Sequence, residues 1–127
     1  MDAETLQDAI ERAARPSGEC RTLGLEQVHE LAETFGSIRE VELAALELGV
    51  VPERYTPNLG TIGINGQRQL LRATVAVVGL GGLGGYVVEA LARMGVGRLI
   101  LIDGDVFEAC NLNRQLLSCE ANMGVEK

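Results

Sequence analysis

The stretch that decides the fold is Thr74-Val-Ala-Val-Val-Gly79-Leu-Gly81-Gly82-Leu-Gly84, an apolar run followed at once by clustered glycines. The apolar run predicts a strand that is buried on both faces. The glycines match the pattern G-x-G-x-x-G. In this pattern Gly79 permits a tight turn, Gly81 lets a phosphate approach the backbone, and Gly84 lets a helix pack closely on the strand. We therefore expect the loop to open a helix whose N-terminal amides face an anion.

A helix and a second strand follow this loop. The helix of about ten residues carries four apolar side chains on one side: Leu83, Val87, Leu91 and Met94. Residues 98–103 (Arg-Leu-Ile-Leu-Ile-Asp) read as a second buried strand, so the segment predicts a right-handed βαβ unit. Asp103 ends that strand, where a carboxylate can accept hydrogen bonds from ribose hydroxyls. The residues predicted so far to bind a nucleotide are Gly79, Gly81, Gly82, Gly84 and Asp103. They do not distinguish among NAD, FAD and ATP as the ligand.

The residues after the second strand favour ATP. Asn111, Arg114 and Gln115 lie just beyond it, and Lys127 follows Arg114 by 13 positions. Cleavage of a triphosphate needs such groups because negative charge builds on the bridging and non-bridging oxygens. Arginine offers a planar fork of donors and lysine a point charge, and both suit phosphate.

The segment before the βαβ unit reads as mainly helical. Apolar spacing predicts helices over residues 2–14, 25–35 and 38–48, the last of them opened by a Ser37–Glu40 capping box. Residues 51–63 read as an extended connector and residues 65–72 as a short helix. We therefore predict an α/β protein with two parts. Residues 1–50 form an acidic helical region, and residues 51–127 form a Rossmann-like nucleotide-binding unit with an incomplete doubly wound sheet.

Charge and composition exclude several classes of protein. The net charge is −7, and all of it lies in residues 1–50. These residues could form a helix-turn-helix, but their negative charge repels the phosphate backbone and disfavours DNA binding. No apolar run is long enough to span a membrane, and the first residues do not form a secretory signal. The three cysteines form no C-x-x-C pair, which suggests a reducing, cytoplasmic setting and predicts no metal site within these residues. The single histidine, His29, is interpreted as a surface or structural residue.

Taken together, these motifs resemble the ThiF/MoeB/HesA superfamily, the bacterial relatives of the ubiquitin-activating enzymes. The resemblance runs over residues 52–127. It rests on the glycine loop, Asp103-Gly-Asp-Val, Asn111-Leu-Asn-Arg-Gln115 and Gly124-Val-Glu-Lys127. Residues 1–50 resemble only an extension found in some bacterial members.

The resemblance implies ATP-dependent adenylation of the C-terminal glycine carboxylate of a ubiquitin-like sulfur-carrier protein. By position, Asp103 would hold the ribose, and Asn111, Arg114 and Lys127 would act as catalytic residues on the phosphates. Asp105 matches a family acid of less certain role, Gln115 would support the loop, and the glycines would line the nucleotide. The implied cofactors are ATP and Mg²⁺, and the implied assembly is a homodimer.

Two departures from the family pattern qualify this expectation. Proline stands at position 57, where many members carry an arginine that reaches an ATP phosphate across a dimer, and Arg54 is the nearest possible replacement. The family's metal-binding aspartate, zinc C-x-x-C pairs and thiol cysteine fall after Lys127. We therefore expect the 127 residues alone to be an inactive fragment that associates through exposed strand edges.

Three alternatives remain open on the sequence. A dehydratase of the same superfamily would activate a carboxylate linked to a tRNA base, a role that the acidic charge disfavours. A non-catalytic module would bind a nucleotide or a partner without chemistry. An ordinary NAD- or FAD-binding fragment would not need Asn111, Arg114 and Gln115.

Overall fold

The computed structural model describes residues 3–127 and contains two compact units. One comprises the described residues up to Arg72, and the other comprises Ala73–Lys127. The sequence predicts a division between residues 50 and 51. The structure places it later because residues 53–72 pack on the helix that precedes them.

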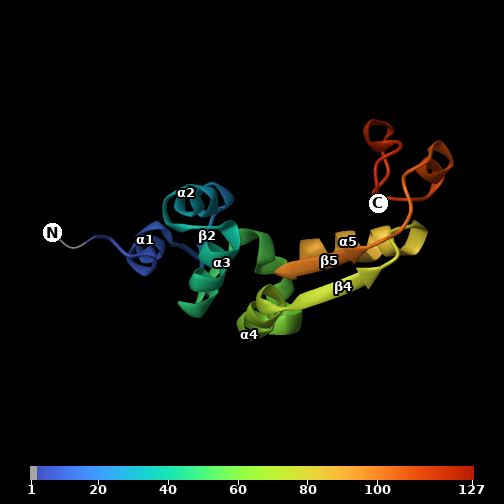
Figure 1. Ribbon diagram of the computed structural model, residues 1–127. Coiled ribbons are helices and arrows are strands. Elements are labelled where there is room, and N and C mark those ends of the chain that lie inside the picture. Colours follow the sequence, from blue (N-terminus) through green and yellow to red (C-terminus); the bar gives the residue numbers. More distant parts are fainter. Residues whose placement is uncertain (1–2) are drawn as a thin grey trace. The chain divides into compact units, whose positions relative to one another are not determined.

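The first unit is built on four helices (Figure 1). They are α1 (Leu6–Ala13), α2 (Leu25–Phe35), α3 (Ile38–Glu47) and α4 (Leu59–Arg72), with the 3-10 segment η1 (Glu53–Asn58) before α4. The three helices predicted before residue 50 are therefore present. Their apolar faces meet in a core of buried residues that includes Ile10, Val28, Val41 and Ala45. The Ser37–Glu40 capping box is confirmed, since the Ser37 hydroxyl accepts from the Glu40 amide and the Glu40 carboxylate accepts from the Ser37 amide.

A three-stranded sheet in this unit was not predicted. Strand β2 (Cys20–Leu23) pairs antiparallel with β1 (Arg15–Ser17) and parallel with β3 (Val50–Pro52). Residues 15–18, which follow the end of α1, thus form one arm of a hairpin that turns at Gly18. The predicted extended connector over residues 51–63 is wrong, because β3, η1 and the first turn of α4 occupy it.

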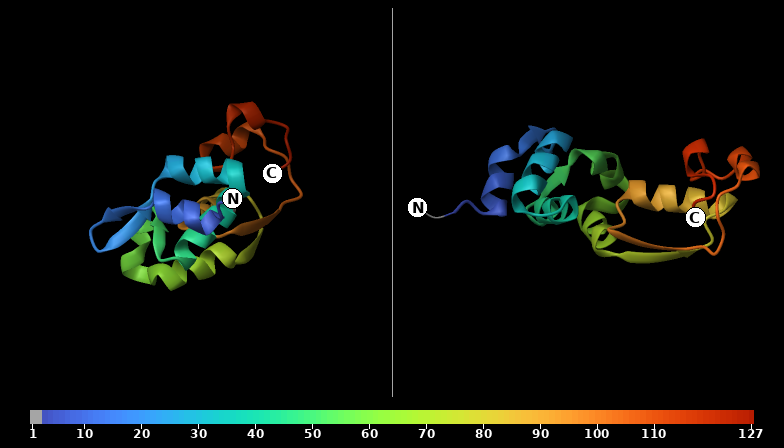
Figure 2. Two further views of the ribbon diagram at one scale, coloured as in Figure 1. Left: turned by 90° about the vertical axis from the view of Figure 1, so that its left-hand side faces the viewer. Right: turned by 45° about the horizontal axis from the view of Figure 1, so that its top comes forward.

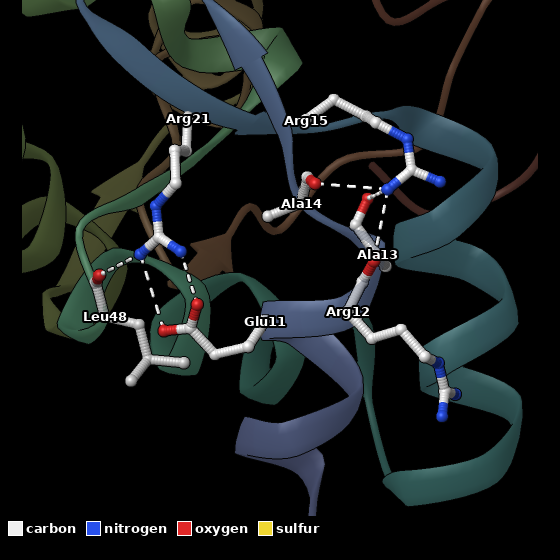
Figure 3. A network of polar contacts seen from close by, with 7 residues as sticks. All are labelled: Glu11, Arg12, Ala13, Ala14, Arg15, Arg21 and Leu48. Carbon is white, nitrogen blue, oxygen red and sulfur yellow. Dashed lines mark hydrogen bonds and ion pairs between the residues drawn. The ribbon is translucent and has the colours of Figure 1, made fainter.

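Arginines join the short elements of the first unit (Figure 3). Arg15 donates through one Nη atom to three carbonyls at the C-terminal end of α1, those of Arg12, Ala13 and the following residue Ala14, at 3.1–3.2 Å. Arg21 on β2 pairs with Glu11 of α1 and donates to the carbonyl of Leu48 at 3.1 Å. These contacts satisfy carbonyls that helix ends leave without an intrahelical partner.

A buried carboxylate fixes η1 against α3. Glu42 is almost fully buried; it accepts a hydrogen bond from the Tyr55 hydroxyl at 2.7 Å and pairs with Nε of Arg54 at 3.1 Å. Burial, together with Glu42, raises the pKa of the Tyr55 hydroxyl well above its ordinary value. Arg54, the cation that could replace the arginine missing at Pro57, is therefore held by a carboxylate of its own unit.

The second unit begins with the predicted βαβ arrangement. Strands β4 (Thr74–Val78) and β5 (Arg98–Ile102) pair in parallel, and α5 (Gly82–Met94) connects them. Two views show α5 running along one face of the strand pair (Figures 1 and 2). Val77, Leu80 and Val88 form the centre of a small core between them. Two 3-10 segments, η2 (Ala109–Asn113) and η3 (Glu120–Asn122), follow β5.

The prediction that both strands are buried on two faces is wrong for this chain. Val78 is 78% exposed, and Ile100, Leu101 and Ile102 of β5 are exposed as well. The reason is that one helix covers only one face of a two-stranded sheet. Within the described residues 3–127, no helix has both the length and the apolar content required to cross a membrane.

Candidate functional site

The glycine loop has the geometry that its sequence predicts. Gly79 adopts a φ of 90°, which favours glycine, and its amide donates to the carbonyl of Ile102 at 2.8 Å. A Cβ atom added to Gly84 would lie 1.7 Å from the carbonyl oxygen of Gly79. The third glycine is therefore required by the close approach of the helix to the loop. Helix α5 starts at Gly82 without a side-chain cap, so its first amides are free to face an anion.

Asp103 ties the glycine loop to the segment after β5. One carboxylate oxygen accepts from the Leu80 amide at 2.7 Å and the other from the Asp105 amide at 2.8 Å. These two donors, Leu80 foremost, hold the pKa of Asp103 below its ordinary value, and the charge of Lys127 adds a smaller effect. The carboxylate therefore stays ionised, and the second lone pair on each oxygen can still accept a hydrogen bond from a ribose hydroxyl.

Segment η2 positions the polar side chains that follow. Asn111 is buried, and its Oδ1 accepts from the amide of Glu108 at 2.8 Å. Arg114 is exposed and donates through Nη1 to the Cys110 carbonyl at 3.2 Å and to Oδ1 of Asn113 at 2.8 Å. The guanidinium is thus aimed by its own segment, while its remaining N–H groups are available to a ligand.

Backbone contacts hold Lys127 beside the same segment. Its amide donates to the Asp105 carbonyl at 3.0 Å, and Val106 and Glu126 form an antiparallel bridge. The ammonium group lies 5.9 Å from the centre of the Phe107 ring, close enough for a cation–π contact. Lys127 therefore occupies a defined place at the site.

A cleft of about 310 Å³ joins these side chains. It is lined by Asp105, Val106, Glu108, Asn111, Arg114, Gln115 and Lys127. Cβ atoms added to Gly81 and Gly82 would lie 3.7 Å from Gln115 and 3.9 Å from Arg114, so the glycine loop borders this group. Figure 2 shows the segment that carries most of these residues, orange to red, near the start of α5. The structure thus brings Asp105, Asn111, Arg114, Gln115 and Lys127 together around one cleft, with Gly81 and Gly82 beside it.

The structure adds Glu108 to the residues predicted from the sequence. Its amide donates to Oδ1 of Asn111, and the residue lines the cleft together with the cations. Its spacing of three residues before an asparagine is a capping signal that could have identified it. Within residues 3–127, no three His, Cys, Asp or Glu side chains are grouped as a metal site would require.

The donors and open spaces of the cleft suit a phosphorylated nucleotide. Two cations, the free amides of α5 and the absence of side chains at Gly81 and Gly82 are what a phosphate group needs. Asp103 is available for a sugar hydroxyl at the neighbouring strand end. The arrangement can therefore bind a nucleotide and stabilise negative charge that develops on its phosphates.

Comparison with known proteins gives matches that include this site. A family described as "ThiF family" matches residues 55–127. The SAMP-activating enzyme E1 of Haloferax volcanii is 42% identical over 59% of this chain and 28% of its own length. The adenylyltransferase and sulfurtransferase MOCS3 of Xenopus laevis is 48% identical over 54% of this chain and 15% of its own length. The chain thus spans less than a third of either curated relative.

Two solved structures align with different extents of the chain. The E. coli tRNA N6-threonylcarbamoyladenosine dehydratase TcdA in complex with AMP has 36% identity and a TM-score of 0.56. It covers 59% of this chain, which spans 30% of that protein. E. coli MccB, solved with AMPCPP and MccA, has 26% identity and a TM-score of 0.54. It covers 96% of this chain, which spans 35% of that protein. The MccB match therefore takes in the first unit as well as the nucleotide-type site.

Proposed function

Because the chain belongs to the ThiF family, we propose that it forms the nucleotide-binding part of an enzyme that uses ATP to adenylate the C-terminal glycine carboxylate of a ubiquitin-like sulfur-carrier protein. The carboxylate oxygen would attack the α-phosphorus, and pyrophosphate would leave. Mg²⁺ would accompany ATP as the counter-ion of its phosphates.

The cleft that gathers Asn111, Arg114 and Lys127 beside the start of α5 carries this proposal. Negative charge moves onto the leaving pyrophosphate during adenylation, and fixed donors nearby lower the energy of that state. The Arg114 guanidinium is oriented by the Cys110 carbonyl, and a backbone bond to Asp105 fixes the main chain of Lys127. Donors that are oriented in advance need little reorganisation when the charge develops.

The names of the relatives support the choice of substrate. SAMP-activating enzyme E1 and MOCS3 are activating or adenylyltransferase enzymes by name, and an AMP-bound relative has been solved. A redox reaction of NAD or FAD would make less use of the two cations that line the cleft, and we therefore do not favour it.

Nucleotide binding is the first test. Titration calorimetry with ATP should show binding to the 127-residue chain, and Arg114→Ala should weaken it severalfold because a charge-assisted contact is lost. Arg98→Ala, which removes an arginine of β5 outside the cleft lining, serves as the control. Absence of ATP binding by the unaltered chain would overturn the proposed function.

ATP–pyrophosphate exchange then identifies the substrate. In a longer polypeptide that contains this chain, exchange that requires a Gly-Gly-ended carrier protein would support the proposal, and exchange that requires tRNA would favour a dehydratase instead. We expect the 127 residues alone to give little exchange, because the resemblance assigns a metal-binding aspartate to a later position. Rapid exchange by the 127-residue chain would contradict that part of the proposal.

A second candidate function is the activation of an MccA-like peptide. It is favoured by the MccB match, which covers 96% of this chain, whereas the TcdA match covers 59%. On this reading the first unit would contribute to substrate binding. Exchange that requires an MccA-type peptide, and that a Gly-Gly-ended carrier protein does not support, would favour this candidate.

A further inference from the structure

Gln115 is a buried polar side chain whose amide oxygen has no partner. The residue is only 6% exposed, and its Oε1 atom accepts no hydrogen bond from residues 3–127. Other amides of the same segment are satisfied. Oδ1 of Asn111 accepts from Glu108 at 2.8 Å, and Nδ2 of Asn122 donates to the Leu117 carbonyl at 2.8 Å. A buried acceptor without a donor lowers the stability of the fold, so this exception calls for an explanation.

The position of Gln115 indicates where the missing donor comes from. The side chain lines the cleft that also contains Arg114 and Lys127. Its Nε2 atom lies against the glycine loop, 3.7 Å from the place of a Cβ on Gly81. Gln115 therefore lines the cleft beside the glycine loop, in the same group of side chains as the two cations.

The chemistry of a nucleotide limits the possible donors. At neutral pH, phosphate oxygens bound by arginine and lysine accept hydrogen bonds and donate none. The donors of ATP are the two ribose hydroxyls and the amino group of adenine. The ribose is bonded directly to the α-phosphate, whereas the amino group lies beyond the sugar on the far side of the base. A ribose hydroxyl is therefore the donor nearest to the phosphate-binding cations.

We propose that Oε1 of Gln115 accepts a hydrogen bond from a ribose hydroxyl and so selects ribonucleotides over deoxyribonucleotides. This inference rests on the proposed function, because it requires that the cleft binds ATP. Asp103 is the other acceptor for the sugar, and its two oxygens already accept hydrogen bonds from the amides of Leu80 and Asp105. Gln115 thus supplies an acceptor that the unliganded fold leaves unused.

Gln115→Met separates a ligand-binding role from a structural one. The methionine has a similar length and removes the unpaired acceptor, so the unliganded chain should unfold at the same or a higher urea concentration. Gln67→Met is the matched control. Gln67 is also fully buried, but its Oε1 accepts from Nδ2 of Asn58 at 2.9 Å, so its replacement should lower stability without altering nucleotide selectivity.

Titration calorimetry with ATP, 2′-deoxy-ATP and 3′-deoxy-ATP tests the proposal. The unaltered chain and Gln67→Met should bind ATP about fivefold more tightly than one of the deoxy analogues, the effect of one hydrogen bond. Gln115→Met should bind that analogue and ATP equally. If the unaltered chain binds no ATP, both the function and this inference fail. Three outcomes would overturn this inference alone while ATP still binds. They are retained selectivity in Gln115→Met, no selectivity between ATP and either deoxy analogue in the unaltered chain, and a loss of stability in Gln115→Met.

Discussion

Gly84 shows how one residue can decide whether the nucleotide loop forms. A methyl group at this position would overlap the Gly79 carbonyl, and backbone atoms on both sides prevent an inexpensive adjustment. We expect Gly84→Ala to lower the free energy of unfolding of the second unit by about 1–3 kcal/mol and to reduce ATP affinity. Urea denaturation and calorimetry measure the two effects.

Gly60 supplies the matched control for this substitution. It lies in α4, and a Cβ added there would meet no atom within 4 Å. Gly60→Ala should leave stability unchanged or raise it by up to about 1 kcal/mol, because alanine reduces the entropy of the unfolded chain. Equal losses for the two variants would contradict the role given to the contact between Gly84 and Gly79.

Asp103 should make the second unit sensitive to acid. A carboxyl group whose pKa is lower in the folded than in the unfolded state stabilises the fold above its unfolded pKa, here near 3.8, and loses this effect as the pH falls through its folded value. Between pH 6 and pH 3, the unaltered chain should therefore lose more stability than Asp103→Asn does. The measurement is urea unfolding at each pH.

Asp105→Asn is the control for this pH dependence. It removes a carboxylate from the same segment but leaves the two Asp103 oxygens that accept hydrogen bonds from the Leu80 and Asp105 amides. Its stability should follow that of the unaltered chain as the pH falls. A profile like that of Asp103→Asn would show that net charge, rather than these hydrogen bonds, causes the acid sensitivity.

At the level of elements, the packing of η1 on α3 depends on a hydroxyl. Tyr55→Phe would remove the donor to Glu42 and leave the buried carboxyl group with Arg54 as its remaining partner. We expect a loss of about 1–3 kcal/mol in the stability of the first unit, measured by urea denaturation. Tyr86→Phe removes a hydroxyl from a residue that is 55% exposed and should cost little, so losses of similar size would contradict this account.

The elements also show what the sequence could and could not predict. The βαβ unit was predictable because each glycine has a local steric role and the apolar runs are long enough to read. The strands Arg15–Ser17 and Val50–Pro52 were not, because three residues show no alternation and the pairing of β3 with β2 joins distant segments.

Sequence spacing predicted the members of the site better than their surroundings. Asn111, Arg114 and Lys127 were chosen as groups able to bind phosphate, and the structure places all three around one cleft. The burial of Gln115 and its unpaired oxygen depend on how the segment after β5 folds against the glycine loop. No local pattern in the sequence contains that information.

At the scale of the whole molecule, exposed apolar surface is concentrated in the second unit. Among the large apolar side chains that are exposed within residues 3–127, all but Leu25 belong to it, and Leu83 is 80% exposed. Exposed apolar side chains in such number favour association. We propose that the chain self-associates through this surface, consistent with the expected homodimer, and that light scattering at micromolar concentration detects it.

Two substitutions of the same type test where association occurs. Leu83→Lys should shift the chain toward the monomer, because a charged group then faces the contact. Leu25→Lys, at a residue that is 52% exposed in the first unit, should leave association unchanged. A compact monomer of the unaltered chain, or equal effects of the two substitutions, would contradict this proposal.

The backbone bond from Lys127 to Asp105 has a consequence for how fast and how tightly a ligand binds. It closes the intervening residues into a loop whose two ends already meet, and the Phe107–Val125 and Gly124–Phe107 bonds reinforce the closure. The entropy of closing such a loop is lost during folding and not when the ligand arrives. The backbone that carries the two cations is therefore ordered before a ligand arrives, and the proposed nucleotide would bind with a smaller loss of entropy than it would on an open loop.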